Sequence, residues 1–110
     1  MRLENKVAII TGGAGGIGLA AVHKFVEEGA HVVIADFNES AGKEVEAFFS
    51  QNARPILFIK TDTSNRDSVE SLVNQTFEVY GKIDILVNNA GITKDAMLQK
   101  MTEQQFDDVI

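Results

Sequence analysis

The chain has 110 residues, of which 45% are apolar, and this is enough for one globular domain with a buried core. Sixteen acidic and ten basic residues give a net charge of −6 without a stripe of Lys or Arg, so nucleic acid is not an expected partner. The absence of cysteine excludes disulfides, thiolate metal sites and cysteine nucleophiles, and the short apolar run after Glu4 predicts neither a signal peptide nor a membrane span. We therefore expect a cytoplasmic protein without a membrane partner.

Four short apolar runs, rich in β-branched residues, predict the strands. They are continuous rather than alternating, which is typical of strands buried on both faces of a parallel sheet. The runs cover residues 7–10, 31–35, 56–59 and 83–87.

Three segments between these runs have apolar residues at helical spacing, and the third is the clearest amphipathic helix. Gly29 and Gly81 stand where glycines end helices, and residues 64–67 and 102–105 both fit a capping box. Strands that alternate with helices predict βαβ units and a parallel sheet. The three apolar stripes are Ile17, Ala20, Ala21 and Phe25; Ala41, Val45, Phe48 and Phe49; and Val69, Leu72, Val73, Thr76, Phe77 and Tyr80.

The stretch TGGAGGIG, residues 11–18, lies between the first predicted strand and the first predicted helix. Its glycines fit two registers, Gly13-x-Gly15-x-x-Gly18 and Gly12-x-x-x-Gly16-x-Gly18. In either register, backbone N–H groups approach a pyrophosphate, and the helix N-terminus adds roughly half a positive charge. The stretch predicts dinucleotide binding, and the alternative is a tight turn from strand to helix.

Asp36 ends the second predicted strand, where an acidic side chain accepts hydrogen bonds from the adenosine ribose. The alternative is a charge at the start of a helix, beside Asn38. A 2′-phosphate at about 4 Å from this carboxylate costs about 4 kcal/mol at an effective dielectric of about 20. Neither Gly13 nor Phe37 offers a compensating cation, so the sequence predicts NAD rather than NADP.

These residues resemble the short-chain dehydrogenases/reductases of the classical type. That family has the glycine motif TGxxxGxG and a fourth strand that ends in NNAG; this chain has TGGAGGIG and, at residues 88–91, NNAG. With Asp36 and the pair Asp62-Thr63, the match spans nearly the whole chain, and it favours the register of Gly12, Gly16 and Gly18. The resemblance implies a Rossmann-type, doubly wound α/β fold in three layers, with strand order 3-2-1-4, helices one and two on one face and helix three on the other.

The resemblance also implies an activity, which is hydride transfer between a nicotinamide cofactor and a carbonyl or alcohol substrate. The segment 92–110 is similar to 3-oxoacyl-acyl-carrier-protein reductases, but family members with alcohol, polyol or steroid substrates share its pattern. The segment therefore does not name the substrate.

The resemblance assigns a set of cofactor-binding residues. Asn88 is expected to be structural, its amide tying the fourth strand to its neighbours. Without the resemblance, Asp62 reads as a turn residue that leads into a helix, and NNAG reads as an ordinary Asn/Gly turn. The implied set is Gly12, Gly15, Gly16, Ile17 and Gly18 at the pyrophosphate and nicotinamide side, Asp62 and Thr63 near the adenine, and Asp36, Asn89, Ala90 and Gly91 at the adenosine ribose.

The residues that carry catalysis in the family are missing from the sequence. The family uses a YxxxK pair, a preceding Ser and an Asn beyond NNAG, and its tyrosine acts as general acid and base. The single tyrosine here, Tyr80, has Asp84 rather than Lys four positions later and lies in an apolar stripe, so it is expected to be structural. His23 and His31 have no metal-ligand spacing. We assign no catalytic residue and no metal ligand.

The sequence therefore predicts that residues 1–110 are a dinucleotide-binding half domain whose C-terminal catalytic half is absent from this chain. Strand four would then be an open edge with exposed apolar residues, which favours self-association into a homo-oligomer. Two alternatives stay open: a self-associating nucleotide-binding or structural module without catalysis, and a mononucleotide or flavin binder.

Overall fold

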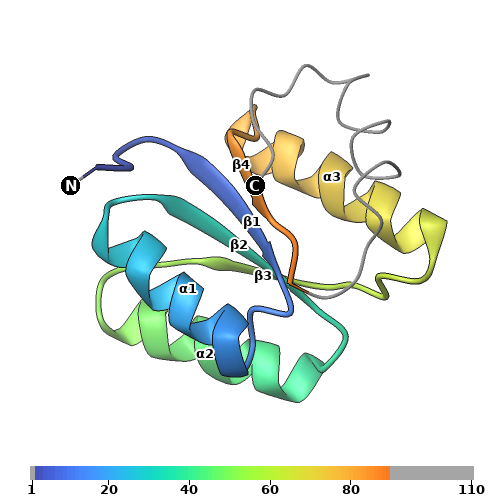
Figure 1. Cartoon of the computed structure of the whole chain (residues 1–110), viewed down its shortest axis with the longest axis horizontal. Coiled ribbons are helices and arrows are strands. Elements are labelled where there is room, and N and C mark those ends of the chain that lie inside the picture. The colour runs from blue at the N-terminus through green and yellow to red at the C-terminus, as the bar shows by residue number, and fades with distance from the viewer. Residues whose placement is uncertain (1, 90–110) are drawn as a thin grey trace.

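A computed structural model describes residues 2–89 and contains one parallel sheet of four strands. The strands lie in the order β3-β2-β1-β4, which confirms the predicted order (Figure 1). Pairing in register joins Val7 to His31 between β1 and β2, and Ala8 to Ile85 between β1 and β4. The strands are β1 (Val7–Thr11), β2 (His31–Asp36), β3 (Leu57–Lys60) and β4 (Ile85–Val87).

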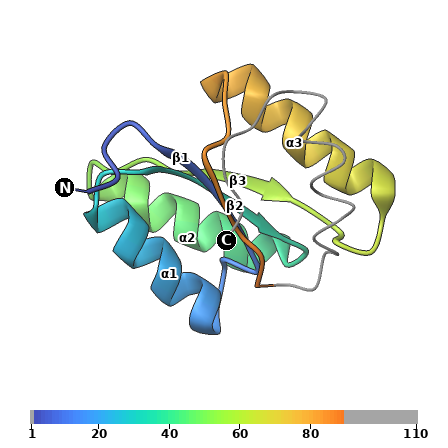
Figure 2. The ribbon, with the colours of Figure 1, turned by 45° about the horizontal axis from the view of Figure 1, so that its top comes forward.

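Three helices complete the three predicted layers. Figures 1 and 2 show α1 and α2 on one face of the sheet and α3 on the other, as expected for a doubly wound fold. In the part of the chain that the structure describes, no helix has the length and apolar character needed to cross a membrane. The helices are α1 (Gly16–Glu27), α2 (Glu39–Gln51) and α3 (Arg66–Tyr80).

The sheet is buried on both faces because helices cover both (Figure 1), and successive side chains of each strand point to opposite sides. In β1, Ile9 packs into the cluster under α3, and Ile10 packs into the cluster under α1 and α2. This arrangement is the physical reason for the continuous apolar runs. Large, fully buried side chains of the two clusters include Ile9, Ile10, Ile34, Leu72, Ile83 and Leu86.

The buried face of α1 differs from the prediction. The expected stripe began at Ile17, but 81% of the Ile17 surface is exposed, and the helix instead buries Gly18, Val22 and Val26. The stripe is rotated because Gly18 packs against the backbone of Gly12, and this contact sets which side of the helix faces the sheet. The spacing of apolar side chains along the helix cannot predict this backbone contact.

The helix ends confirm the predicted glycines and correct one cap. Gly81 ends α3 in the left-handed region at φ 77°, a conformation that favours glycine. The N-cap of α3 is Asn65, whose side chain accepts the N–H of Ser68, rather than the predicted Ser64. Ser64 instead donates to Asp62, so the turn before the helix uses the hydroxyl that the capping box required.

The strand β4 is shorter than predicted and is anchored at its start by Asp84. The Asp84 carboxylate accepts the N–H of Val7 at 2.8 Å and pairs with the ammonium of Lys82 at 3.0 Å. Its own N–H donates to the carbonyl oxygen of Val7 at 2.9 Å, so the residue is joined to β1 in both directions. The side chains of Ile85 and Leu86 are buried rather than exposed, which corrects the expectation for this edge.

Candidate functional site

The glycine-rich loop joins the carboxyl end of β1 to the start of α1. Gly12 and Gly16 both have positive φ angles, 67° and 55°, in the region that L side chains rarely adopt. The N–H of Gly12 donates to the carbonyl oxygen of Ala35 in β2 at 2.7 Å, so the loop begins as an extension of the sheet. The loop therefore lies beyond the carboxyl ends of the strands, where open α/β sheets bind ligands.

The glycines of the motif have two different physical roles. A Cβ on Gly13 would lie 2.8 Å from Cγ2 of Ile34, and a Cβ on Gly18 would collide with the carbonyl group of Gly12. A Cβ on Gly15 or Gly16 would meet no atom within 4 Å. Gly13 and Gly18 thus permit close packing, whereas Gly15 and Gly16 leave open space above their backbone.

The N-terminus of α1 is suited to an anion. The side chain of Asn38 caps α2 and that of Asn65 caps α3, but among the described residues no side chain caps α1. The first turn of α1 also holds no acidic residue. Its backbone N–H groups and its positive dipole end are consequently directed at the space beside Gly15 and Gly16.

Asp36 ends β2, as predicted, and its carboxylate is held by two backbone donors. One oxygen accepts the N–H of Ala14 in the glycine loop at 3.1 Å, and the other accepts the N–H of Asn38 at 2.9 Å. An ionised carboxylate offers about four acceptor positions, so about two remain for a ligand. Asp36 therefore joins the loop to β2, and its carboxylate can still accept hydrogen bonds from hydroxyl groups of a ligand.

Asp62 and Thr63 follow β3, and Asp62 has the turn role that its sequence position suggested. Its carboxylate accepts the hydroxyl of Ser64 at 2.6 Å and the N–H of Ser64 at 3.0 Å. These two hydrogen bonds, the hydroxyl first, hold the pKa of Asp62 below its usual range. The N–H of Asp62 donates to the Ser68 hydroxyl at 2.8 Å, and Thr63 is half-buried.

A buried threonine connects the ends of β1 and β4. The hydroxyl of Thr11 lies 3.2 Å from Oδ1 of Asn88, to which it donates, and accepts the N–H of Asn89 at 2.7 Å. The predicted tie between the Asn88 amide and a neighbouring strand is thus present. Ala90 and Gly91, the other predicted contacts of this segment, lie outside the described residues.

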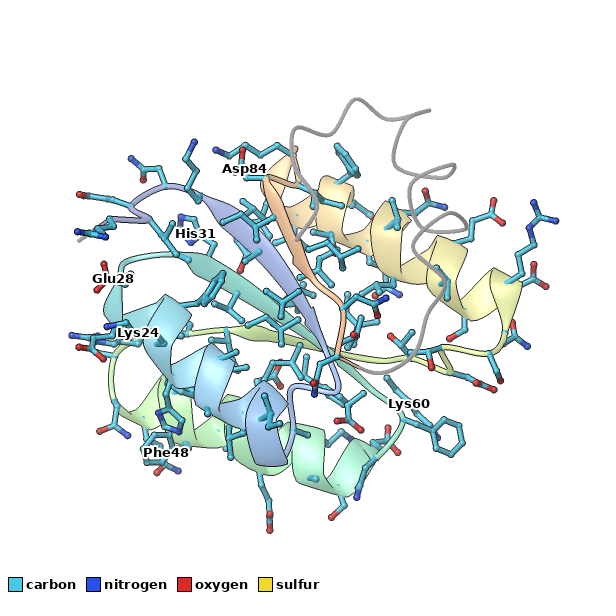
Figure 3. All side chains as sticks on the ribbon, in the orientation of Figure 1. Lys24, Glu28, His31, Phe48, Lys60 and Asp84 are labelled. Atoms are coloured by element: carbon cyan, nitrogen blue, oxygen red, sulfur yellow. The ribbon has the colours of Figure 1, made fainter. Side chains whose placement is uncertain are left out.

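The structure also brings a cation to this end of the sheet, which the sequence reasoning missed. Lys60, the last residue of β3, is paired in register with Asp36, and its ammonium lies 5.2 Å from the centre of the Phe37 ring (Figure 3). The Phe37 ring is 65% exposed. The sequence shows only a lysine at the end of a predicted strand. That this lysine lies beside Asp36 depends on the register between β2 and β3, which the sequence pattern does not give.

The fold and the site define a class of protein. A parallel sheet in the order β3-β2-β1-β4, with a glycine-rich loop between β1 and α1, is a Rossmann-type α/β fold. The sequence from residue 6 to residue 110 matches the model of the short chain dehydrogenase family. The chain belongs to this family.

Curated relatives and solved structures agree with this assignment. An uncharacterized oxidoreductase of Mycobacterium bovis is 45% identical, covering 98% of this chain and 43% of the relative. A 3-oxoacyl-[acyl-carrier-protein] reductase of Thermotoga maritima is 44% identical, covering 100% of this chain and 45% of the relative. The chain therefore spans less than half the length of these relatives.

Among solved structures, a hydroxysteroid dehydrogenase from Escherichia coli is similar with a TM-score of 0.86 and 28% identity, covering 94% of this chain and 51% of that one. A short-chain dehydrogenase/reductase from Burkholderia phymatum, in complex with NAD, has a TM-score of 0.74 and 30% identity, covering 78% of this chain and 31% of that one.

Proposed function

We propose that this chain binds NAD and is the cofactor-binding half of an oxidoreductase that transfers hydride between nicotinamide and a carbonyl or alcohol substrate. The observation that carries the proposal is the arrangement at the glycine loop. Two open glycines and the uncapped N-terminus of α1 lie beside the Asp36 carboxylate, which is fixed to the same loop. These residues fit a dinucleotide because they pair an anion-binding helix end with an acceptor for ribose hydroxyls.

The proposed contacts follow from this arrangement and from the family. The open glycines and the first turn of α1 would hold the pyrophosphate, and the exposed side chain of Ile17 would extend toward the nicotinamide side. Asp36 would accept the adenosine ribose hydroxyls. The full proposed set is Gly12, Gly15, Gly16, Ile17, Gly18, Asp36, Asp62, Thr63, Asn89, Ala90 and Gly91.

The proposed preference is for NAD over NADP. A 2′-phosphate would lie beside the Asp36 carboxylate, and two unit charges about 4 Å apart repel by about 4 kcal/mol at an effective dielectric of about 20. The carboxylate cannot easily turn away, because both of its oxygens accept backbone N–H groups. The repulsion therefore supports NAD as the cofactor.

When bound, the nicotinamide supplies the hydride acceptor or donor, and the protein supplies binding and orientation. No residue of these 110 is proposed as catalytic. Tyr80 packs against the core beneath α3, half-buried, away from the carboxyl ends of the strands. A coding sequence that continues past Ile110 into Ser and YxxxK elements would support the half-domain proposal. Robust dehydrogenase turnover by the 110-residue chain alone would contradict the half-domain proposal.

A titration of the 110-residue chain with NADH, followed by nicotinamide fluorescence, tests the binding proposal. The sharpest variant is Gly15→Val, because Gly15 has φ −163°, which any residue adopts, and a Cβ there meets no atom within 4 Å. We expect an unchanged circular dichroism spectrum. The NADH dissociation constant should rise about tenfold or more, because overpacking a close contact costs about 1–3 kcal/mol.

The control is Ala47→Val, which places the same valine side chain on the exposed face of α2. It should bind NADH as the parent does. Equal NADH affinity for Gly15→Val and the parent would refute the proposed pyrophosphate position. Binding of AMP or FMN without binding of NADH would favour the mononucleotide or flavin alternative.

A further inference from the structure

Lys60 and Asp36 are neighbours at the carboxyl ends of two adjacent strands. They are paired in register between β3 and β2, so their side chains leave the sheet on the same side. Two residues earlier, Ile34 and Phe58 pack into the cluster under α1 and α2, and the alternation along a strand places Asp36 and Lys60 on that face as well. This is the face that carries the glycine loop.

The two opposite charges do not pair, although their strands are adjacent. The Asp36 oxygens accept the N–H groups of Ala14 and Asn38, while the Lys60 ammonium lies over the Phe37 ring at 5.2 Å from its centre. Lys60 is exposed and, among residues 2–89, forms no ion pair with a carboxylate. A cation–π contact of this length is a weak restraint at an exposed site, so the ammonium remains accessible to an anion.

We propose that Lys60, whose ammonium lies over the Phe37 ring, is a specificity-determining residue of the dinucleotide site. The inference rests on the proposed function, because it concerns the ribose end of that same site. An ammonium donates hydrogen bonds to phosphate oxygens and attracts their charge. Lys60 therefore offsets part of the repulsion between the Asp36 carboxylate and a 2′-phosphate. The site discriminates between NAD and NADP less sharply than Asp36 alone would dictate.

The inference differs from the sequence argument in a way that can be measured. With Asp36 considered alone, neutralising a nearby lysine has no effect on the choice of cofactor. With Lys60 as the cation beside the ribose, its removal raises selectivity for NADH. When Asp36 is neutral, Lys60 becomes the dominant charge near the 2′-position, and NADPH binding depends on it.

The test is the ratio of NADPH to NADH dissociation constants, measured by nicotinamide fluorescence for four forms of the 110-residue chain. The forms are the parent, Lys60→Met, Asp36→Asn and the double variant. We expect Lys60→Met to raise the ratio about fivefold, which is the upper end for an exposed ion pair, because a phosphate monoester carries up to about two negative charges. We expect the double variant to bind NADPH about fivefold more weakly than Asp36→Asn does.

Lys24→Met is the matched control, because Lys24 is also an exposed lysine but lies in the last turn of α1, at the opposite end of the sheet from Lys60 (Figure 3). It removes the same charge and should leave the ratio unchanged. Two results would overturn the inference if the parent chain still binds NADH. In one, Lys60→Met leaves the ratio unchanged both in the parent and in Asp36→Asn; in the other, Lys24→Met and Lys60→Met shift the ratio equally. A parent chain that binds neither nucleotide would instead overturn the proposed function, and this inference with it.

Discussion

Replacing Thr11 by valine tests the connection between β1 and the segment after β4. The substitution keeps the shape of the side chain but removes a fully buried hydroxyl, which donates to Asn88 and accepts the N–H of Asn89 at 2.7 Å. A typical hydrogen bond contributes about 1 kcal/mol, and the N–H of Asn89, which loses its acceptor, belongs to an exposed residue and can bond to water instead. We therefore expect Thr11→Val, which removes two such hydrogen bonds, to lower the free energy of unfolding by about 1–2 kcal/mol.

Urea denaturation followed by circular dichroism measures this loss. With a slope of about 1–1.5 kcal/mol per molar urea for a chain of this size, the midpoint should fall by roughly 1 M. Thr76→Val is the matched control, because the Thr76 hydroxyl is equally buried but donates only to the carbonyl oxygen of Leu72 in its own helix. Equal midpoint shifts for the two variants would refute the reasoning, since the hydroxyl of Thr11 would then contribute no more than a hydroxyl within a helix.

Two further predictions concern the edge of the sheet and the single tyrosine. Glu46→Ala removes the carboxylate that accepts the N–H of Phe58 at 2.8 Å, and this exposes an unpaired donor on the edge strand β3. We expect light scattering to show more self-association than for Glu44→Ala, an exposed neighbour on α2, and equal scattering would contradict this role. Burial raises the pKa of Tyr80 above its ordinary 10.0, so the neutral phenol stabilises the fold. That contribution is complete below pH 10 and is lost as the pH rises through the folded pKa. Phenolate absorbance should therefore appear at higher pH in the folded chain than in urea, and coincident titrations would exclude the effect.

The succession of strands and helices along the chain could be predicted from local patterns, whereas the strand order and the face that each helix covers were implied by the resemblance to the family. The continuous apolar run at 7–10 needs burial on both faces, and the structure supplies it with Ile9 and Ile10 on opposite sides. Gly81 ended its helix where predicted, because a left-handed residue is needed there. The exposure of Ile17 was not predictable in this way, because it depends on how the loop presses α1 against Gly12.

The residues of the candidate site also divide into those that the sequence pattern identifies and those that only contacts between elements reveal. Asp36 was identified from its place after a strand and a glycine loop, and the structure puts its carboxylate on that loop. Lys60 was missed because only the register of β2 against β3 makes it the neighbour of Asp36. The different roles of Gly13 and Gly15 were likewise invisible, since one faces Ile34 and the other faces open space.

Asp36 couples two parts of the proposed site that the sequence treats as separate. Its carboxylate accepts the N–H of Ala14, so the residue that would select the ribose also fixes the loop that would hold the pyrophosphate. A substitution at Asp36 should therefore change both the order of the loop and the choice of cofactor. Lys60 makes no hydrogen bond to that loop among the described residues, so its substitution changes the local charge and leaves the loop in place. For this reason Lys60, rather than Asp36, is the position at which the electrostatic part of cofactor selection can be measured separately.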